Sequence, residues 1–209
     1  MDEPLSDLDA KLRGEMRTEL KRLHKDTAST FVYVTHDQLE AMTLSSKICM
    51  MNEGVLQQYA PPLEVYNHPA NLFVADFVGN PSMNIIQARA KKTAPAAAEI
   101  DFLGQKALFR AGEDFDLNSE NVSVGIRPEF LPISPSGDIE GLAYSTLPAG
   151  METTVKIKVD DTILSSVVFG AIDYETDAPV RFSVSGSGIL LFDRSSGRNI
   201  AVGSLTVRK

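Results

Sequence analysis

The pattern of hydrophobic and polar positions along this 209-residue chain changes at about residue 80. Near the start, apolar residues recur every three or four positions, as on one face of an amphipathic helix. They are Leu8, Leu12, Met16, Leu20 and Leu23. Residues 6–9 fit a capping box, so we predict a helix that begins at Ser6 and packs its apolar face against another part of the fold.

After this helix, short strands and short helices alternate. Residues 30–35 are β-branched and aromatic without alternation, which is typical of a strand buried on both faces of a parallel sheet. Residues 47–51 form a second such strand and end at a turn signal over residues 52–54. Further helices are predicted at about 38–46 and 70–77, and prolines bracket residues 63–67 between them. This alternation indicates an α/β domain.

From residue 84 onward, short strand candidates are separated by turn residues, which predicts a small all-β barrel. The candidates are residues 84–90, 107–110, 122–126, 153–159, 163–169, 180–184 and 189–192. Residues 94–98 are small and irregular, and we predict a loop there.

Charge restricts the possible partners. The net charge is −8, and neither residues 1–80 (7 basic, 12 acidic) nor residues 81–209 (13 basic, 16 acidic) form a basic part. Because affinity for nucleic acid depends on neutralising phosphates, nucleic acid is disfavoured as a partner. Hydrophobic residues make up 43% of the chain and charged residues 23%, so we expect a folded protein with a core.

The single cysteine, Cys49, cannot form an internal disulfide, which favours a reducing, cytoplasmic setting. It lies in an apolar run, so we expect a buried, inert thiol. No uncharged stretch approaches the ~20 apolar residues of a membrane-spanning helix, and no signal-peptide pattern opens the sequence. We therefore expect neither a membrane span nor secretion.

Candidate chemistry is concentrated in residues 1–80. Asp2 and Glu3 precede the first predicted helix, and His36 follows the predicted strand at 30–35. If a strand leads into Asp2, a strand–helix–strand crossover would place these side chains at the carboxyl ends of parallel strands, where open α/β sheets bind ligands. Simpler interpretations remain open. Asp2 and Glu3 could be solvated acids or could cap the helix, and His36 could be a structural histidine.

Four motifs, in this order, resemble those of ATP-binding-cassette (ABC) ATPases. Residues 2–13 (DEPLSDLDAKLR) resemble the end of the Walker B strand and the D-loop, and residues 33–42 (YVTHDQLEAM) resemble the switch-histidine segment. Residues 62–79 are similar to the end of the nucleotide-binding domain in the carbohydrate-uptake branch, the maltose, glycerol-3-phosphate and multiple-sugar importers. Residues 124–129 (VGIRPE) resemble a segment of that branch's regulatory domain.

The resemblance implies a fold in two parts. Residues 1–80 would be the C-terminal part of an ABC nucleotide-binding domain, an α/β fold of the P-loop NTPase type that is only partly present. Residues 81–209 would be an all-β, OB-like (TOBE/MOP-like) regulatory domain. No Walker A sequence, Q-loop or Leu-Ser-Gly-Gly-Gln signature occurs in the chain.

The resemblance also implies roles for individual residues. Asp2 would hold magnesium through water, Glu3 would orient or deprotonate the attacking water, and His36 would donate a hydrogen bond to the γ-phosphate. Asp9 would belong to the loop that links two ATP sites across a dimer. Mg-ATP would be the cofactor of the complete protein, and we expect none to bind to this chain alone.

The resemblance therefore predicts the C-terminal portion of the ATP-hydrolysing subunit of an ABC importer for sugars or sugar phosphates, itself inactive. It would be cytoplasmic, peripheral at the inner face of the membrane, paired as a homodimer through the regulatory domain and bound to permease subunits. The alternative is a freestanding β-barrel module that binds a small ligand or an oligonucleotide. The absence of tryptophan and the negative charge of residues 81–209 disfavour the oligonucleotide.

Overall fold

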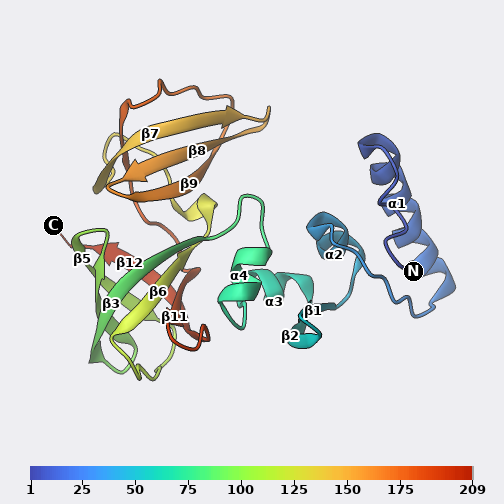
Figure 1. Cartoon of the computed structure of the whole chain (residues 1–209), viewed down its shortest axis with the longest axis horizontal. Coiled ribbons are helices and arrows are strands. Elements are labelled where there is room, and N and C mark those ends of the chain that lie inside the picture. The colour runs from blue at the N-terminus through green and yellow to red at the C-terminus, as the bar shows by residue number, and fades with distance from the viewer. Residues whose placement is uncertain (209) are drawn as a thin grey trace. The chain divides into compact units, whose positions relative to one another are not determined.

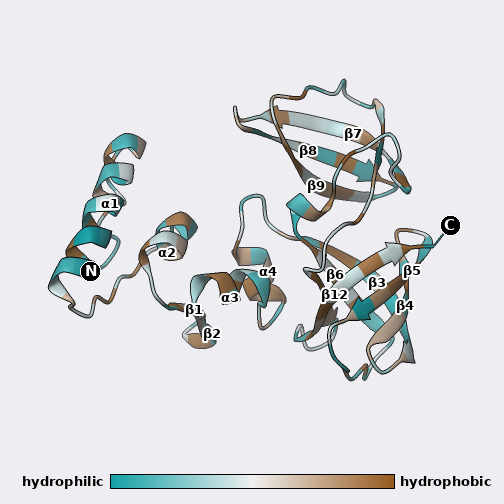
Figure 2. Cartoon of the chain, turned by 180° about the vertical axis from the view of Figure 1, so that it is seen from behind, coloured by the Kyte–Doolittle hydropathy of each residue, from teal (hydrophilic) through white to brown (hydrophobic). Residues whose placement is uncertain are grey.

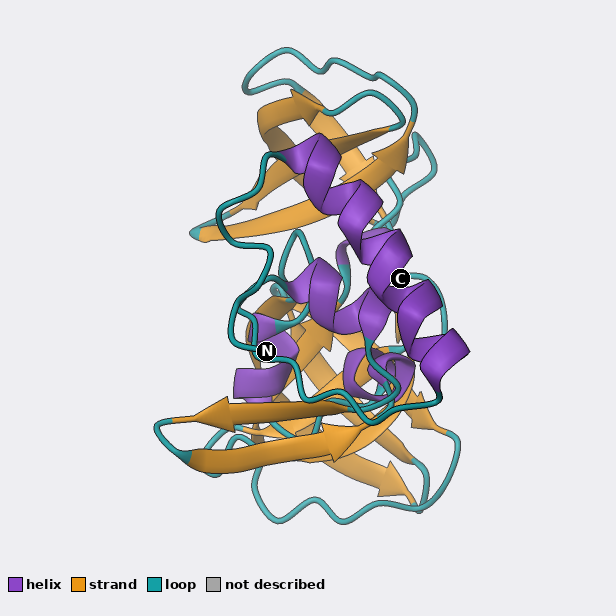
Figure 3. Ribbon diagram, turned by 90° about the vertical axis from the view of Figure 1, so that its right-hand side faces the viewer, coloured by secondary structure: helices purple, strands orange, loops and turns teal. Residues whose placement is uncertain are grey.

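The computed structural model describes residues 1–208, and the chain divides into two compact units. The N-terminal unit is Met1–Asn67, and the β unit is His68–Lys209. The α-helices all lie within the first 77 residues, and the described residues beyond them form strands, loops and one 3₁₀ turn (Figure 3). The change in hydrophobic pattern near residue 80 of the sequence therefore corresponds to the end of the α-helical part of the chain.

The N-terminal unit contains three helices and one β-hairpin. Its elements are α1 (Ala10–Thr27), α2 (Gln38–Leu44), β1 (Ile48–Asn52), β2 (Val55–Ala60) and α3 (Pro62–Asn67). The strands β1 and β2 pair antiparallel. Five apolar side chains of this unit are buried: Leu5, Ile48, Met50, Ala60 and Val65.

Helix α1 differs from the prediction at its start and on its apolar face. The N-cap is Asp9, whose carboxylate accepts from the amides of Lys11 and Leu12, so the helix does not begin at Ser6. None of its residues is buried in the described chain, and Leu12 and Leu23 are 40% and 49% exposed. Figure 2 shows a largely hydrophilic helix. The other apolar positions of this face, Leu8, Met16 and Leu20, are half-buried, and α1 contacts α2, so the predicted packing is present only in part.

The parallel sheet predicted for the N-terminal unit is not present among the described residues. Within residues 30–35 only Val34 pairs, in a single parallel bridge with Asp2, and Val32 is 74% exposed. Among residues 1–208, no strand other than the short segment around Asp2 pairs with it, so the ladder does not extend. The second predicted strand is β1, but its partner is the antiparallel β2.

The prediction of a buried thiol at Cys49 is wrong. Along β1 the side chains of Ile48 and Met50 are buried, whereas Cys49 and Met51 are exposed. A hairpin that is covered on one face buries alternate residues, unlike a central strand that is covered on both.

The β unit begins with α4 (Leu72–Phe77) and continues with ten strands (Figure 1). They are β3 (Asn84–Ala94), β4 (Ala97–Phe102), β5 (Gln105–Ala111), β6 (Asn121–Ile126), β7 (Ile139–Pro148), β8 (Glu152–Val159), β9 (Thr162–Phe169), β10 (Pro179–Phe182), β11 (Ile189–Asp193) and β12 (Asn199–Val207). Between β6 and β7 lies the 3₁₀ turn η1 (Pro128–Phe130).

These strands form two sheets within the β unit. Six of them close into an antiparallel barrel in the order β11-β12-β5-β4-β3-β6, and the other four form a sheet in the order β10-β7-β8-β9. All seven predicted strands are present, and the predicted β barrel is confirmed for β3, β5, β6 and β11, whereas β8, β9 and β10 lie in the four-stranded sheet. The closed barrel is compatible with an OB-like domain. Three strands were missed, β4, β7 and β12, and the loop predicted at residues 94–98 is the tight hairpin between β3 and β4.

One hydrophobic core runs through both sheets of the β unit. Its fully buried aromatic side chains come from the barrel (Phe102, Phe109) and from the four-stranded sheet (Phe182). The buried Asn84 at the start of β3 ties the sheets together, because its amide donates to the Ser165 carbonyl at 2.8 Å and accepts from the Ser165 amide at 2.6 Å. Within residues 1–208, no helix has the length and apolar character needed to span a membrane.

Candidate functional site

The main chain of the N-terminal unit brings the first residues beside the segment that carries His36. The Val34 amide donates to the Met1 carbonyl at 2.9 Å, and the Glu3 amide donates to the Val34 carbonyl at 2.8 Å. The Asp2–Val34 bridge is parallel, so both segments run in the same direction and end at the same edge. The structure therefore brings the backbone of Asp2 and Glu3 beside the segment that leads to His36, as the strand–helix–strand interpretation predicts.

Glu3 and His36 are in direct contact. The His36 Nδ1 atom lies 3.0 Å from the Glu3 Oε1 atom, with 73% and 44% of the two side chains exposed. The hydrogen bond to Glu3, followed by the charge of that carboxylate, raises the pKa of His36 above its ordinary value of 6.5. The protonated imidazole donates through both ring nitrogens, so His36 can hold Glu3 through Nδ1 and offer Nε2–H to an anionic group.

The backbone of Glu3 is itself constrained. Its φ angle of 40° lies in the left-handed region, which residues other than glycine rarely adopt. The carbonyl of Glu3 accepts from the Ser6 amide at 3.2 Å and from the Ser6 hydroxyl at 3.0 Å. This turn fixes the direction from which the Glu3 side chain meets His36.

Asp9 and Asp2 are not part of the contact between Glu3 and His36. The Asp9 carboxylate caps α1 through a single oxygen, Oδ1, at 3.0 Å from the amides of Lys11 and Leu12. Asp2 is exposed and offers one carboxylate, the ligand type that Mg²⁺ accepts together with waters and phosphate oxygens. Among residues 1–208, no three acidic, histidine or cysteine side chains converge as a metal site.

Two residues of the N-terminal unit were missed as candidates. The sequence places Glu40 and Asp37 only within a motif. In the structure Glu40 is 3% exposed. Asp37 caps α2 and pairs with Arg13 at 3.4 Å. An acid that becomes buried on a short helix leaves no periodicity signal of its own. Its position one turn after the histidine was the available clue.

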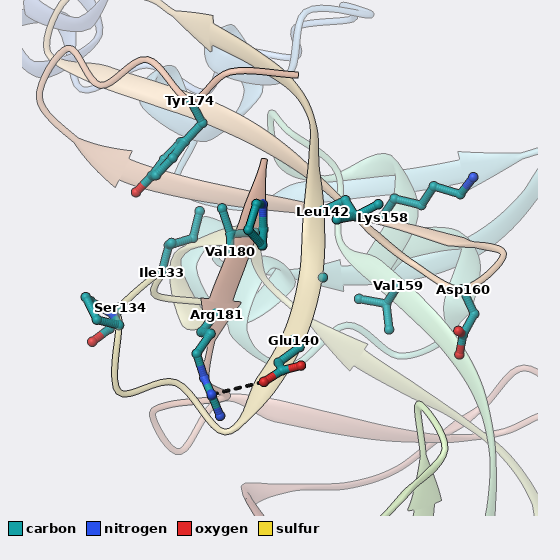
Figure 4. A pocket seen from close by; sticks show the side chains of 13 residues that line it. Ile133, Ser134, Glu140, Leu142, Lys158, Val159, Asp160, Tyr174, Val180 and Arg181 are labelled. Carbon is teal, nitrogen blue, oxygen red and sulfur yellow. Dashed lines mark ion pairs between the residues drawn. The ribbon is translucent and has the colours of Figure 1, made fainter. Parts of the chain in front are cut away.

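The β unit contains a groove of about 890 Å³ on its four-stranded sheet (Figure 4). Apolar side chains line much of it, among them Ile133, Leu142 and Val180. Arg181 pairs with Glu140 at 3.0 Å and donates to the Gly137 carbonyl at 2.9 Å. Figure 4 shows Lys158 extending away from this ion pair. Arg181 and Glu140 thus neutralise each other within the groove.

Arg127, at the end of β6, has a structural role. It is 2% exposed, and its guanidinium donates to the carbonyls of Ala75, at 3.2 Å, and Val78. These carbonyls lie at the C-terminal end of α4, where backbone acceptors have no partner within the helix. The arginine of the 124–129 segment therefore fastens α4 to the barrel.

Comparisons with known proteins identify relatives over nearly the whole chain. It is 40% identical over 202 residues to the sulfoquinovosyl glycerol transport ATP-binding protein of Agrobacterium fabrum, covering 95% of this chain and 56% of that protein. It is 42% identical over 162 residues to the maltose/maltodextrin import ATP-binding protein of Photorhabdus laumondii, covering 76% and 44%. The chain spans about half the length of the curated relatives it matches. No family model matches it.

Proposed function

Because this chain is homologous to the ATP-binding subunits of carbohydrate-importing ABC transporters, we propose that it forms the C-terminal portion of such a subunit and serves ATP-coupled uptake of sugars or sugar phosphates. The homology over 95% of the chain carries the proposal. The contact between Glu3 and His36 supports it, since the two motifs assigned to ATP hydrolysis meet in space.

In this function Glu3 is the base that orients and deprotonates the attacking water, and His36 donates a hydrogen bond to the γ-phosphate. Their hydrogen bond acts on both groups: the carboxylate raises the pKa of His36, and the imidazole holds the carboxylate in place. Asp2, next to Glu3, holds Mg²⁺ through water. The metal supplies charge neutralisation on the phosphates, and the protein groups supply positioning.

Asp9 has a second role beyond capping α1. Because the cap uses Oδ1, the Oδ2 atom remains to face a second subunit. The subunit pairs as a homodimer through the β unit, binds transmembrane permease subunits at the cytoplasmic face of the membrane and does not bind nucleic acid. The β unit, whose closed barrel resembles an OB fold, is its regulatory domain, and residues 1–80 complete a nucleotide-binding domain.

The chain by itself should neither bind nor hydrolyse ATP, because it contains no phosphate-binding Gly-x-x-x-x-Gly-Lys-Ser/Thr loop. Calorimetry with Mg-ATP should detect no saturable heat. Micromolar binding would show that the chain has a nucleotide site of a different kind.

The direct test is a chimera in which the N-terminal portion of the Agrobacterium fabrum relative precedes Met1 of this chain. We expect the chimera to hydrolyse ATP. Glu3→Gln should keep ATP binding and lose turnover, and His36→Ala should lower turnover on the order of 10²-fold with ATP affinity retained. Glu64→Gln, an exposed acid on α3, is the matched control. Turnover that survives Glu3→Gln would contradict the assignment.

A further inference from the structure

The N-terminal unit contains one buried carboxylate whose purpose the proposed function does not explain. Glu40 on α2 is 3% exposed and is the one acidic side chain that is buried among residues 1–208. No ion pair to it is found in the described chain. Burying an unpaired charge is costly unless hydrogen bonds compensate for lost water. The hydrogen bonds made by this carboxylate are therefore the feature to explain.

Two hydroxyl groups compensate the charge, and both come from the segment that leads to His36. The Tyr33 hydroxyl donates to Glu40 Oε2 at 3.0 Å, and the Thr35 hydroxyl donates to the same oxygen at 2.8 Å. Burial, followed by the hydrogen bond to Glu40, raises the pKa of Tyr33, so the phenol remains a donor at neutral pH. Glu40 therefore fixes the chain at alternate residues immediately before the histidine.

The residue after His36 is tied to the same network. The Thr35 Oγ1 atom accepts from the Asp37 amide at 3.0 Å, which closes a turn around His36. The Asp37 carboxylate accepts from the Leu39 and Glu40 amides at 2.8 and 3.1 Å, so it also caps the helix that carries Glu40. His36 is thus an exposed side chain held between two anchored neighbours.

We propose that Glu40 is a positioning residue for His36. Through one carboxylate oxygen it holds Thr35, and Thr35 holds Asp37, so that the imidazole stays against Glu3. A carboxylate suits this task because it accepts two hydroxyl hydrogens at one atom without donating in return. The inference rests on the proposed function, in which His36 acts on the γ-phosphate.

The positioning is tested on the 209-residue chain by NMR relaxation. The order parameter of the His36 amide should be near ~0.85 in the unchanged chain and fall below ~0.6 in Glu40→Ala. Thr35→Val, which keeps the shape of threonine but lacks the hydroxyl, should cause the same loss, whereas Thr35→Ser should keep the unchanged value. Glu64→Gln, on the exposed side of α3, is the control for removing a carboxylate.

Two outcomes would overturn the positioning role. One is a His36 order parameter that is unchanged in both Glu40→Ala and Thr35→Val. The other is equal loss in Thr35→Val and Thr35→Ser, since the hydroxyl would then be irrelevant. If Glu40→Ala does not fold, the smaller Thr35→Val and Thr35→Ser changes still decide, because signals of the β1–β2 hairpin report whether the unit is intact.

Turnover of the chimera separates this inference from the proposed function. We expect Thr35→Val to lower kcat about tenfold with KM for ATP unchanged, and Thr35→Ser to restore it. Lost order at His36 with normal turnover would support the positioning role and contradict the role of His36 in hydrolysis. Lowered turnover with unchanged order would overturn the positioning role and leave the proposed function intact.

Discussion

The two units of this chain bury their apolar side chains to different extents. In the β unit both sheets share one core, and phenylalanines such as Phe102, Phe109 and Phe182 are fully buried. In the N-terminal unit large apolar side chains remain exposed, among them Val32 at 74% and Leu63 at 71%. The barrel supplies every strand with neighbours from within its own unit, whereas the strand segment around Val34 meets a single short neighbour.

The difference shows what holds each unit in shape. The β unit is stabilised mainly by apolar burial, which contributes about 25 cal/mol per Å² removed from water. The described order of the N-terminal unit depends more on directed hydrogen bonds: the Asp9 and Asp37 caps, the Glu40 network and the Glu3–His36 contact. The same exposed apolar residues would be buried if further polypeptide completed the domain, as the proposed function requires.

The largest expected effect contrasts core burial in the two units. Phe109→Ala in the barrel should lower the free energy of unfolding by about 3–5 kcal/mol, because it leaves a cavity beside Phe115. Leu12→Ala on α1, where the side chain is 40% exposed, should change it by less than about 0.5 kcal/mol. Urea denaturation followed by circular dichroism measures both. A comparable loss for Leu12→Ala would show that α1 is packed in solution.

The next effect concerns a buried charge in the β unit. Arg127→Met keeps the long side chain but removes the donors to Ala75 and Val78, and should cost about 2–3 kcal/mol. The matched control is Arg89→Met, because the Arg89–Glu120 pair at 3.2 Å is 70% and 64% exposed and is worth less than about 1 kcal/mol. Equal costs in urea denaturation would mean that Arg127 does not fasten α4.

We expect the exposed apolar side chains to cause the chain to self-associate. We expect light scattering to report a dimer or larger species rather than the 22.7 kDa monomer. Val32→Ser combined with Leu63→Ser should lower the average mass. Met151→Ser combined with Phe169→Ser, at residues of the β unit that are 83% and 84% exposed, is the counterpart. A clean monomer in the unchanged chain would refute the expectation, and a response to the second pair alone would place the association in the β unit.

The smallest effect is the pH dependence of the Glu3–His36 contact. Because the folded pKa of His36 is raised, the contact contributes stability that is fully present below about pH 6.5 and is lost as the pH rises through the folded pKa. NMR titration should find that Glu3→Gln lowers the pKa of His36. The His24 signals serve as a reference that should not move between the two proteins. No change at His36 would show that the contact does not form in solution.

Much of the fold followed from local pattern. Helices α1, α2 and α4, strand β1 and seven of the β-unit strands were predicted, because periodicity and turn residues act over a few neighbours. Strand β4 was missed in part because its Ala97–Phe102 sequence, AAEIDF, contains residues with weak strand preference. Pairing with β3 and β5 makes it a strand, and those partners lie outside the local window.

The sequence by itself singled out Asp2, Glu3 and His36 as candidates for chemistry, and it predicted that they lie at the carboxyl ends of parallel strands if a strand leads into Asp2. The tertiary structure decided the surroundings: that Glu3 contacts Nδ1, that Glu40 and Arg127 are buried, and that Cys49 is exposed. Burial depends on what covers a side chain, and the covering groups are distant in sequence. Glu40 and Arg127 are tolerated inside because hydroxyls and helix-end carbonyls reach them, and only the folded chain brings those partners together.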